Sequence, residues 1–266
     1  PGLCTVTLRS LDPPEVVRLA ADAGVEVLEW GGDVHVPPGE VVAAERVRRL
    51  TEDAGLAVLS YGSYLFLDDA TAGAPAARID GVLDTAVALG SPWVRVWGGL
   101  GVEPDADGAD WDAVVAAGRR VAAAATSRHL LLVLEFHGGT PTASAAGAVR
   151  LLEAIGSPAC LTAWQPPYWD PTDPDRERAD LGALAPRLAH LHVYDWEPDG
   201  SRHPLERGRD RWVDRVRVAL GAGVAVPAGA PRGAFLEFLP GDDPAVLARE
   251  AAVLRGVLAA AGGAPT

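Results

Sequence analysis

Apolar and polar positions follow a repeating order along the chain: a short run rich in Val, Leu and Ile, a polar or Gly/Pro loop, then an Ala/Leu/Val/Arg segment. The short runs predict strands near residues 3–7, 25–30, 57–61, 93–97, 130–136, 160–165, 188–194 and 233–238. The longer segments predict helices near residues 13–23, 39–54, 75–89, 109–128, 142–155, 178–186, 209–221 and 243–261. The strand runs are too continuously apolar for one-sided antiparallel strands and are typical of a parallel sheet covered by helices.

Glycines mark the boundaries of this repeat. Gly24, Gly55, Gly90 and Gly156 each precede a predicted strand, where a left-handed glycine ends the preceding helix. Alternating strands and helices indicate an α/β fold, and eight units favour a closed (β/α)₈ TIM barrel over an open sheet. The length of 266 residues is near the ~250 typical of such a barrel. No linker or break in composition is visible, so we expect a single TIM-barrel domain over residues 1–266.

The least regular stretch is the Pro/Asp-rich segment 166–178, which follows the sixth predicted strand. In a barrel this loop lies at the catalytic face, where the carboxyl ends of the strands meet. Polar and aromatic side chains also collect at those strand ends. They are Glu29, Trp30, Asp33, His35, Arg95, Trp97, Glu135, His137, Gln165, Tyr168, His190, His192, Asp195, Trp196 and Glu237.

Four of these residues predict a metal site. Strand parity directs Glu135, Gln165, His192 and Glu237 into the barrel mouth at similar height. Two carboxylates, an amide oxygen and an imidazole nitrogen are suitable ligands for a divalent cation. Without a cation, two facing carboxylates in a dry cavity would repel each other. A single polar residue at a strand end is more often structural, but four convergent residues on consecutive strands reverse that expectation.

Composition excludes several functions. A net charge of −13 opposes nucleic-acid binding, which needs clustered cations. All 23 Lys and Arg positions are Arg, which excludes mechanisms that require a Schiff-base lysine or a P-loop lysine. No apolar run is long enough to cross a bilayer and no leader is apparent, so we expect a cytoplasmic protein without a membrane partner. Cys4 and Cys160 are too few for a disulfide framework and are expected to be buried thiols.

The chain resembles the xylose isomerase-like TIM-barrel superfamily in three features: Glu135, the HxH motif that ends at His192, and Glu237. That superfamily includes ketose 3-epimerases, hydroxypyruvate isomerase, inosose dehydratase and apurinic endonucleases. The resemblance covers nearly the whole chain, and the segments EWGGDVHVP, WQPP and HPL resemble its sugar phosphate isomerase/epimerase branch. It implies that Glu135, His192 and Glu237 are metal ligands and that both glutamates also act as acid/base groups.

The chain departs from the superfamily pattern on strand six. The family carries Asp followed three residues later by His, whereas this chain has Gln165 and Tyr168, so the site loses one negative charge. The family's arginine after the strand-seven histidine is also missing at its usual spacing, and Arg202 is the nearest candidate.

These features together predict a divalent-metal-dependent isomerase or epimerase acting on a sugar or sugar-like hydroxy-carbonyl compound. One glutamate would remove a carbon proton and the other return it through a metal-bound enediolate. We expect manganese, with magnesium, cobalt or zinc as alternatives. The predicted substrate-binding residues are Glu29, Trp30, Asp33, His35, Arg95, Trp97, His137, Tyr168, Asp195, Trp196 and Arg202, with Trp169 as a further candidate for the pocket wall.

Other functions stay open at this point. Elimination from the same enediolate would make the protein a dehydratase or a lyase on a keto-sugar or keto-glycoside. Gln165 also suits a non-catalytic ligand-binding barrel. An endonuclease-like phosphodiester hydrolase is the least favoured, because the net charge opposes DNA binding and such enzymes use more histidine ligands than this chain supplies. The expected partner is a small carbohydrate-like molecule, and oligomer formation stays open.

Overall fold

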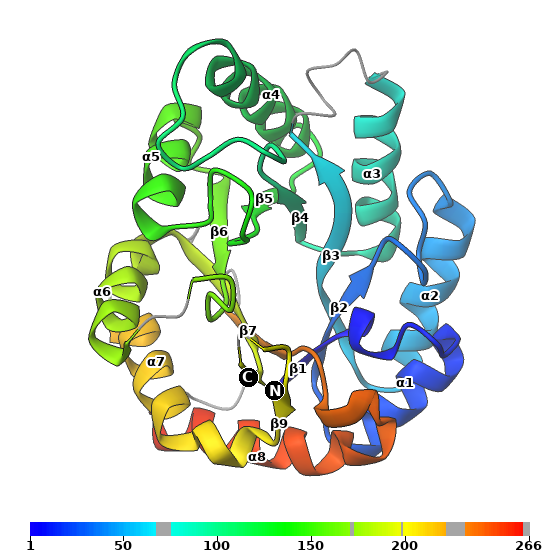
Figure 1. Cartoon of the computed structure of the whole chain (residues 1–266). Coiled ribbons are helices and arrows are strands. Elements are labelled where there is room, and N and C mark those ends of the chain that lie inside the picture. The colour runs from blue at the N-terminus through cyan, green and yellow to red at the C-terminus, as the bar shows by residue number, and fades with distance from the viewer. Residues whose placement is uncertain (68–75, 171–172, 198, 222–231, 263–266) are drawn as a thin grey trace.

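Eight parallel strands close into a barrel in the order β1-β10-β7-β6-β5-β4-β3-β2, which confirms the predicted architecture (Figure 1). The computed structural model describes residues 1–67, 76–170, 173–197, 199–221 and 232–262. The barrel strands are β1 (Gly2–Cys4), β2 (Val27–Gly31), β3 (Ala57–Phe66), β4 (Trp93–Trp97), β5 (Leu131–Leu134), β6 (Cys160–Trp164), β7 (Leu188–Val193) and β10 (Gly233–Leu236).

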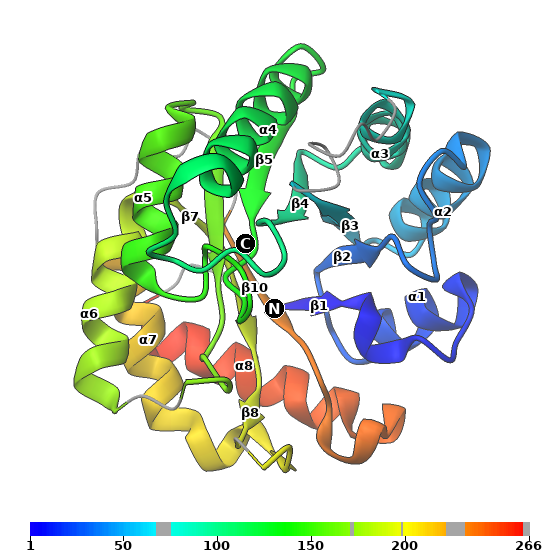
Figure 2. The same ribbon diagram turned by 45° about the horizontal axis from the view of Figure 1, so that its top comes forward.

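Within the described ranges, eight α-helices surround these strands as an outer ring (Figure 2). They are α1 (Pro13–Asp22), α2 (Val41–Asp53), α3 (Ala76–Leu89), α4 (Gly108–Thr126), α5 (Ala145–Ile155), α6 (Pro174–Leu184), α7 (Arg209–Gly221) and α8 (Leu247–Ala260). The four glycines expected to end helices all have left-handed backbones, with φ of 70° at Gly24, 75° at Gly55, 69° at Gly90 and 70° at Gly156. None of the helices in the described ranges is long and apolar enough to span a membrane.

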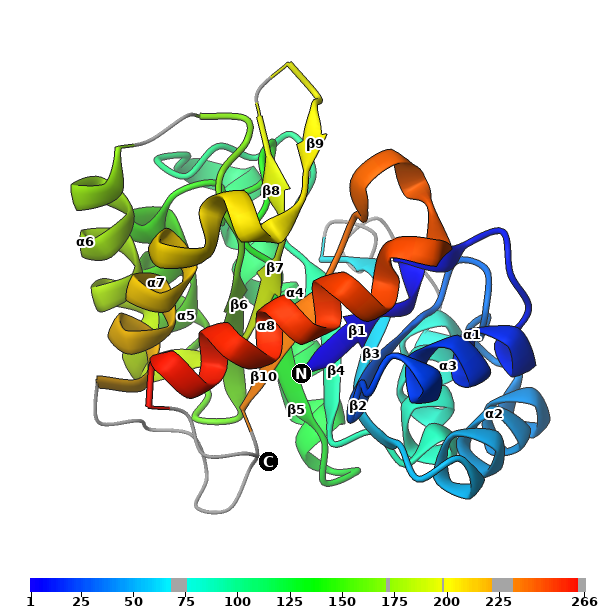
Figure 3. The same cartoon turned by 90° about the horizontal axis from the view of Figure 1, so that it is seen from below.

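Three local predictions from the sequence were wrong. The first strand is shorter than predicted, because residues Thr5–Leu8 turn into a 3₁₀ helix. The predicted loop 166–178 ends early: α6 begins at Pro174, since the Asp173 carboxylate accepts hydrogen bonds from the first backbone N–H groups of the helix. Strands β8 (Asp195–Trp196) and β9 (Arg202–His203) form an antiparallel hairpin that was not predicted, and it projects from one end of the barrel (Figure 3).

The apolar core supports the polar layer of the barrel mouth. Most buried apolar side chains pack between strands and helices. A second cluster fills the barrel interior and consists of Cys4, Val6, Leu59, Trp93, Val133, Leu161, Ala163, Ala189 and Phe235. Because alternate residues of a strand share a face, the residues two positions after Trp93, Val133 and Phe235 also point inward. Those residues are Arg95, Glu135 and Glu237, so charged groups lie directly above a packed apolar layer.

The close approach of α5 to its preceding loop gives a stability prediction. A Cβ on Gly147 would lie only 2.2 Å from the carbonyl oxygen of Pro141. We expect Gly147→Ala to lower the free energy of unfolding by about 1–3 kcal/mol through overpacking, as measured by urea unfolding.

The matched control is Gly182→Ala in the exposed part of α6, where no atom lies within 4 Å of the added Cβ. It should raise the free energy of unfolding by about 0.5–1 kcal/mol, because alanine is the better helix former. Equal effects of the two substitutions would contradict the packing seen around α5.

Candidate functional site

Six polar side chains form one buried layer at the mouth end of the barrel. Strand β2 carries Glu29, β4 carries Arg95, and β7 carries His192, while three further residues immediately follow β5, β6 and β10. These three are Glu135, Gln165 and Glu237. Each of the six is at most 6% exposed, so their charges must be balanced by one another or by a bound group.

Glu29 is the most connected member of this layer. Its Oε1 accepts from the Cys4 thiol at 3.1 Å and from Arg95 Nε at 3.0 Å, and its Oε2 accepts from the Ser60 hydroxyl at 2.7 Å. Burial alone would raise the pKa of Glu29, but the charges of Arg95 and His192 hold it well below its usual value. Glu29 is therefore a buried, ionised carboxylate at the centre of the barrel.

Arg95 joins two carboxylates from different strands. Its guanidinium pairs with Glu29 through Nε and with Glu135 through an ηN–H group. Burial lowers the pKa of Arg95, but Glu29 and the other neighbouring acidic groups together raise it more, so the group stays charged. Gly62 on β3 makes room for the guanidinium, since a Cβ there would lie 2.5 Å from an Arg95 ηN atom. The sequence predicted Arg95 to be a substrate contact, and the structure places it below the mouth with only 2% exposed.

His192 lies between two carboxylates. Its Nε2 is 3.2 Å from Glu29 and its Nδ1 is 3.3 Å from Glu237. Burial would lower the pKa of His192, but Glu237 and Glu29 raise it to about 9, so the ring is protonated at neutral pH in this metal-free arrangement. The neighbouring His190 differs, because burial lowers its pKa to about 3 and keeps its ring neutral.

A divalent cation fits the donor set of this layer. Three carboxyl groups (Glu29, Glu135 and Glu237) face a single permanent cation, Arg95, and the remaining positive charge depends on protonation of His192. Both ring nitrogens of His192 and Oε2 of Glu237 are buried, and the ion-pair contacts of His192 at 3.2 and 3.3 Å lack hydrogen-bond geometry. Buried polar atoms of this kind are costly unless a further group binds them.

The four predicted metal ligands are not equally available. Glu135 is paired with Arg95, and the amide nitrogen of Gln165 donates to the Phe136 carbonyl at 2.7 Å. The amide oxygen of Gln165 accepts only a long hydrogen bond, at 3.4 Å, from the Tyr194 hydroxyl. In the part of the chain that the structure describes, Cys4, Glu29 and His192 are the group of three His, Cys, Asp or Glu residues whose ligand atoms all lie within 4.8 Å of one another.

Aromatic side chains form the rim above this layer. Trp97 packs on His137 with ring centroids 4.1 Å apart, and Tyr168 stacks on Trp196 at 4.4 Å. His137 donates from Nδ1 to the Gly138 carbonyl at 2.8 Å, so its Nε2 accepts from the Tyr168 hydroxyl at 3.1 Å. All four rings are half-buried and so present partly open aromatic surface.

Arg202 lies at the same rim, with its guanidinium carbon 5.0 Å from the centroid of Trp196 and 4.7 Å from that of Phe238. It also pairs with Asp242, which neutralises its charge. The rim therefore combines aromatic faces with a neutralised cation.

Two predicted substrate contacts on the β2 side do not reach the barrel centre. Trp30 is fully buried against α2, where its indole donates to the Thr51 hydroxyl at 3.2 Å. Successive strand residues point to opposite faces, so Glu29 faces inward and Trp30 faces the helices. His35 is buried and bonded to the Thr5 hydroxyl at 3.0 Å.

Asp33 lies at the surface and pairs with Arg9 at 2.6 Å. The same Arg9 guanidinium also donates to the hydroxyl of Tyr64, a residue of β3. Arg9 and Tyr64 were not singled out from the sequence. Only their positions, after β1 and within β3, could have indicated them.

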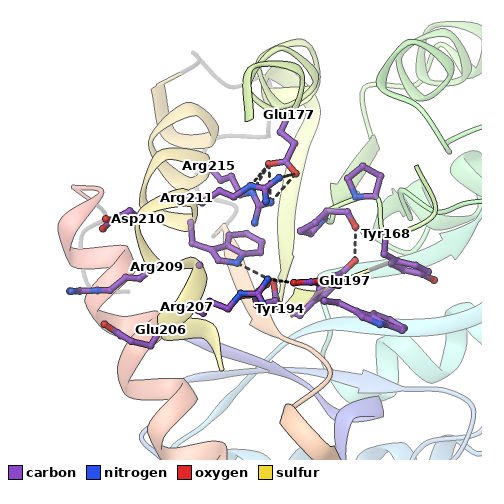
Figure 4. A pocket seen from close by; sticks show the side chains of 16 residues that line it. Tyr168, Glu177, Tyr194, Glu197, Glu206, Arg207, Arg209, Asp210, Arg211 and Arg215 are labelled. Atoms are coloured by element: carbon purple, nitrogen blue, oxygen red, sulfur yellow. Dashed lines mark hydrogen bonds and ion pairs between the residues drawn. The ribbon is translucent and has the colours of Figure 1, made fainter. Parts of the chain in front are cut away.

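A separate cavity of about 740 Å³ lies beside the mouth, between α6, α7 and the β8–β9 hairpin (Figure 4). Tyr168, Tyr194 and Trp196 form part of its wall. Asp195 lines this cavity, with Oδ2 3.5 Å from Arg207 Nε, so it lies apart from the buried polar layer.

Glu177 lines the same cavity, and its buried carboxylate accepts hydrogen bonds from both Arg211 and Arg215. These contacts tie α6 to α7.

Comparisons with known proteins agree with the observed barrel. The sequence matches the family model described as xylose isomerase-like TIM barrel over residues 17–238. No curated protein matches the sequence.

Solved structures similar to this chain include the probable 3-DHS dehydratase AsbF from Bacillus anthracis, with 18% identity, a TM-score of 0.73, and coverage of 96% of this chain and 98% of that chain. An L-ribulose 3-epimerase has 17% identity, a TM-score of 0.71 and coverage of 98% and 95%. A xylose isomerase-like TIM barrel protein from Mycobacterium smegmatis in complex with magnesium has 16% identity, a TM-score of 0.70 and coverage of 93% and 88%. At such identities the likeness shows the fold alone.

Removal of the buried guanidinium should be costly. Arg95→Met leaves Glu29 and Glu135 without their cation, and we expect a loss of about 3–5 kcal/mol in the free energy of unfolding. Arg48→Met is the control, since Arg48 pairs with Glu52 on the exposed face of α2 and should contribute less than about 1 kcal/mol.

Adding Glu29→Gln to Arg95→Met should restore part of the lost stability, because one unpaired charge is then removed. If Arg95→Met is no worse than Arg48→Met in urea unfolding, the buried network is not what balances these carboxylates.

His192 predicts a pH dependence of the metal-free protein. Its folded pKa of about 9 lies above the ordinary value of 6.5, so its stabilising contribution is complete below about pH 6.5 and is lost as the pH rises through about 9. Urea unfolding in the presence of a chelator should therefore show the wild-type protein losing stability across this range relative to His192→Gln. Parallel pH profiles would show that His192 carries no proton between its two carboxylates.

Proposed function

The chain belongs to the xylose isomerase-like TIM-barrel family, and from this premise we propose that it is a divalent-metal-dependent isomerase or epimerase of small sugar-like hydroxy-carbonyl compounds. One observation carries the proposal. Glu135 and Glu237 are buried carboxyl groups that follow separate strands at the mouth of the barrel. Glu135 lies beside the positively charged Arg95, and Glu237 lies beside the positively charged His192. Isomerisation and epimerisation need such a pair, because one group removes a carbon proton and another returns it.

The surroundings of the two glutamates suggest different roles. Oε2 of Glu237 lies 3.3 Å from His192 Nδ1, and we assign this carboxylate the removal of the proton from a substrate carbon. Glu135 is oriented by Arg95 and by the apolar layer beneath it, and it would return the proton on the second step. Arg95 touches Glu135 rather than the mouth, so we assign it a positioning role.

The predicted ligand set for the ion is Glu135, Gln165, His192 and Glu237, and manganese is the metal that we propose, with magnesium, cobalt or zinc as alternatives. When bound, the ion would polarise the substrate carbonyl and acidify the neighbouring hydroxyl group. A cation would also relieve His192 of the need to carry a proton between two carboxylates.

The rim supports a carbohydrate-like substrate. Trp97, Tyr168 and Trp196 offer half-buried aromatic faces, which pack well on the C–H faces of a sugar ring. The Tyr168 hydroxyl and the exposed pair of Asp33 with Arg9 supply hydrogen-bonding groups around them. A cytoplasmic location remains a prediction from the sequence.

Solvent deuterium exchange tests the reaction. The protein loaded with Mn²⁺ should introduce deuterium from D₂O at a carbon beside the carbonyl of at least one member of a ketose panel, observed by NMR. Glu135→Gln and Glu237→Gln should each slow this exchange by about 10²-fold or more, because each loses a proton-transfer group. A product with one C–O bond fewer would instead identify the same site as a dehydratase or lyase.

Glu153→Gln provides the control, since Glu153 lies on the exposed face of α5 away from the mouth. It should exchange at the wild-type rate, and a chelator should stop exchange in both proteins. Near-full exchange by Glu237→Gln would remove that residue from the mechanism.

A further inference from the structure

We propose that the barrel centre binds a zinc-type divalent cation, Zn²⁺ or Co²⁺, through the thiolate of Cys4, the carboxylate of Glu29 and Nε2 of His192. The inference rests on the proposed function for the presence of a divalent ion, and it assigns that ion a different ligand set and a different class of metal. His192 is the only residue shared with the ligand set expected from the sequence.

The topology of the barrel brings these three ligands together. Strands β1 and β2 pair in parallel with Cys4 directly opposite Glu29, and His192 reaches the same point from β7. Glu29 Oε1 lies 3.1 Å from Cys4 Sγ and 3.2 Å from His192 Nε2. All three side chains are at most 1% exposed, so rigid strands rather than mobile loops hold the donor atoms.

His190 is an independent sign that a group binds here. Its side chain is fully buried, yet neither ring nitrogen makes a hydrogen bond to any described residue. Its Nε2 lies 3.6 Å from Glu29 Oε2. A thiolate, a carboxylate and two imidazoles form a donor set that zinc accepts as four ligands.

The other nitrogen of His192 also fits this assignment. Its Nδ1 lies 3.3 Å from Glu237 Oε2, so a ring that binds an ion through Nε2 can donate its Nδ1 proton to Glu237. Metal-bound histidines commonly have a carboxylate in this position. Glu135 and Glu237 would then not be ligands, and a carboxylate that is not committed to an ion is the better base.

The charges and the proton balance are consistent with a thiolate ligand. On binding, bonds form from the ion to Cys4 Sγ, the Glu29 carboxylate and His192 Nε2, and two protons leave to solvent, one from the Cys4 thiol and one from Nε2 of the protonated His192 ring. Three carboxylates and one thiolate then face Arg95 and the divalent ion, which leaves one net negative charge, the same as in the ion-free site with His192 protonated. Sulfur and imidazole ligands favour zinc and cobalt over magnesium and manganese.

Cobalt spectroscopy tests the assignment with a matched control. Metal-stripped protein titrated with Co²⁺ should develop a thiolate-to-cobalt charge-transfer band in the near ultraviolet. Cys4→Ser should abolish this band and weaken Zn²⁺ binding by about 10²-fold, whereas Cys160→Ser should leave both unchanged. Cys160 is the appropriate control because it is equally buried and lies on β6.

The possible outcomes separate this inference from the proposed function. Cobalt bound by the wild-type protein without a sulfur band, or a band that persists in Cys4→Ser, would overturn the Cys4 site and leave an oxygen and nitrogen site in place. Failure of the wild-type protein to bind either Co²⁺ or Zn²⁺ would overturn this inference and remove the zinc and cobalt options from the proposed function. If Cys4→Ser does not fold, zinc X-ray absorption of the wild-type protein decides: one sulfur neighbour near ~2.3 Å is expected, and none would refute the assignment.

Discussion

The ion-paired network of Glu29, Arg95 and Glu135 is the constraint on which the interior of this barrel depends. Charges taken out of water destabilise a fold unless their partners are held in place, and here three strands supply the partners. The guanidinium fits only because β3 has glycine at position 62. The polar layer is thus part of the core packing, and any substrate must meet side chains whose positions are already fixed by their mutual attraction.

The architecture followed from the sequence because its signals are local. Eight apolar runs, eight helical segments and glycines at helix ends each reflect the conformational preference of a short segment, and β4 occupies the predicted residues. The errors arose where a tertiary or very short feature dominates. Strands of two residues in the β8–β9 hairpin are too short to show alternation, and the early start of α6 depends on the Asp173 cap before Pro174.

The candidate site was predicted only in part, for a physical reason. Strand parity identifies which residues point inward, and it directed Glu135 and Glu237 correctly to the interior. Parity does not reveal which inward groups bind one another. Arg95 pairs with Glu135, and Cys4 lies against Glu29, because of barrel closure and the register between neighbouring strands. Both are long-range properties that no local pattern encodes.

His192 divides the barrel centre into two halves with different chemistry. One ring nitrogen faces Glu237 and the open mouth, and the other faces the deeper pair of Glu29 and Cys4. An imidazole between two carboxylates must either carry a proton or give one nitrogen to a metal ion, since a neutral ring can donate to only one of them. Proton and metal ion are thus alternative ways to satisfy the same ring. Acid should therefore compete with metal for this site, and binding of the ion should leave Glu237 as the acceptor of the remaining N–H.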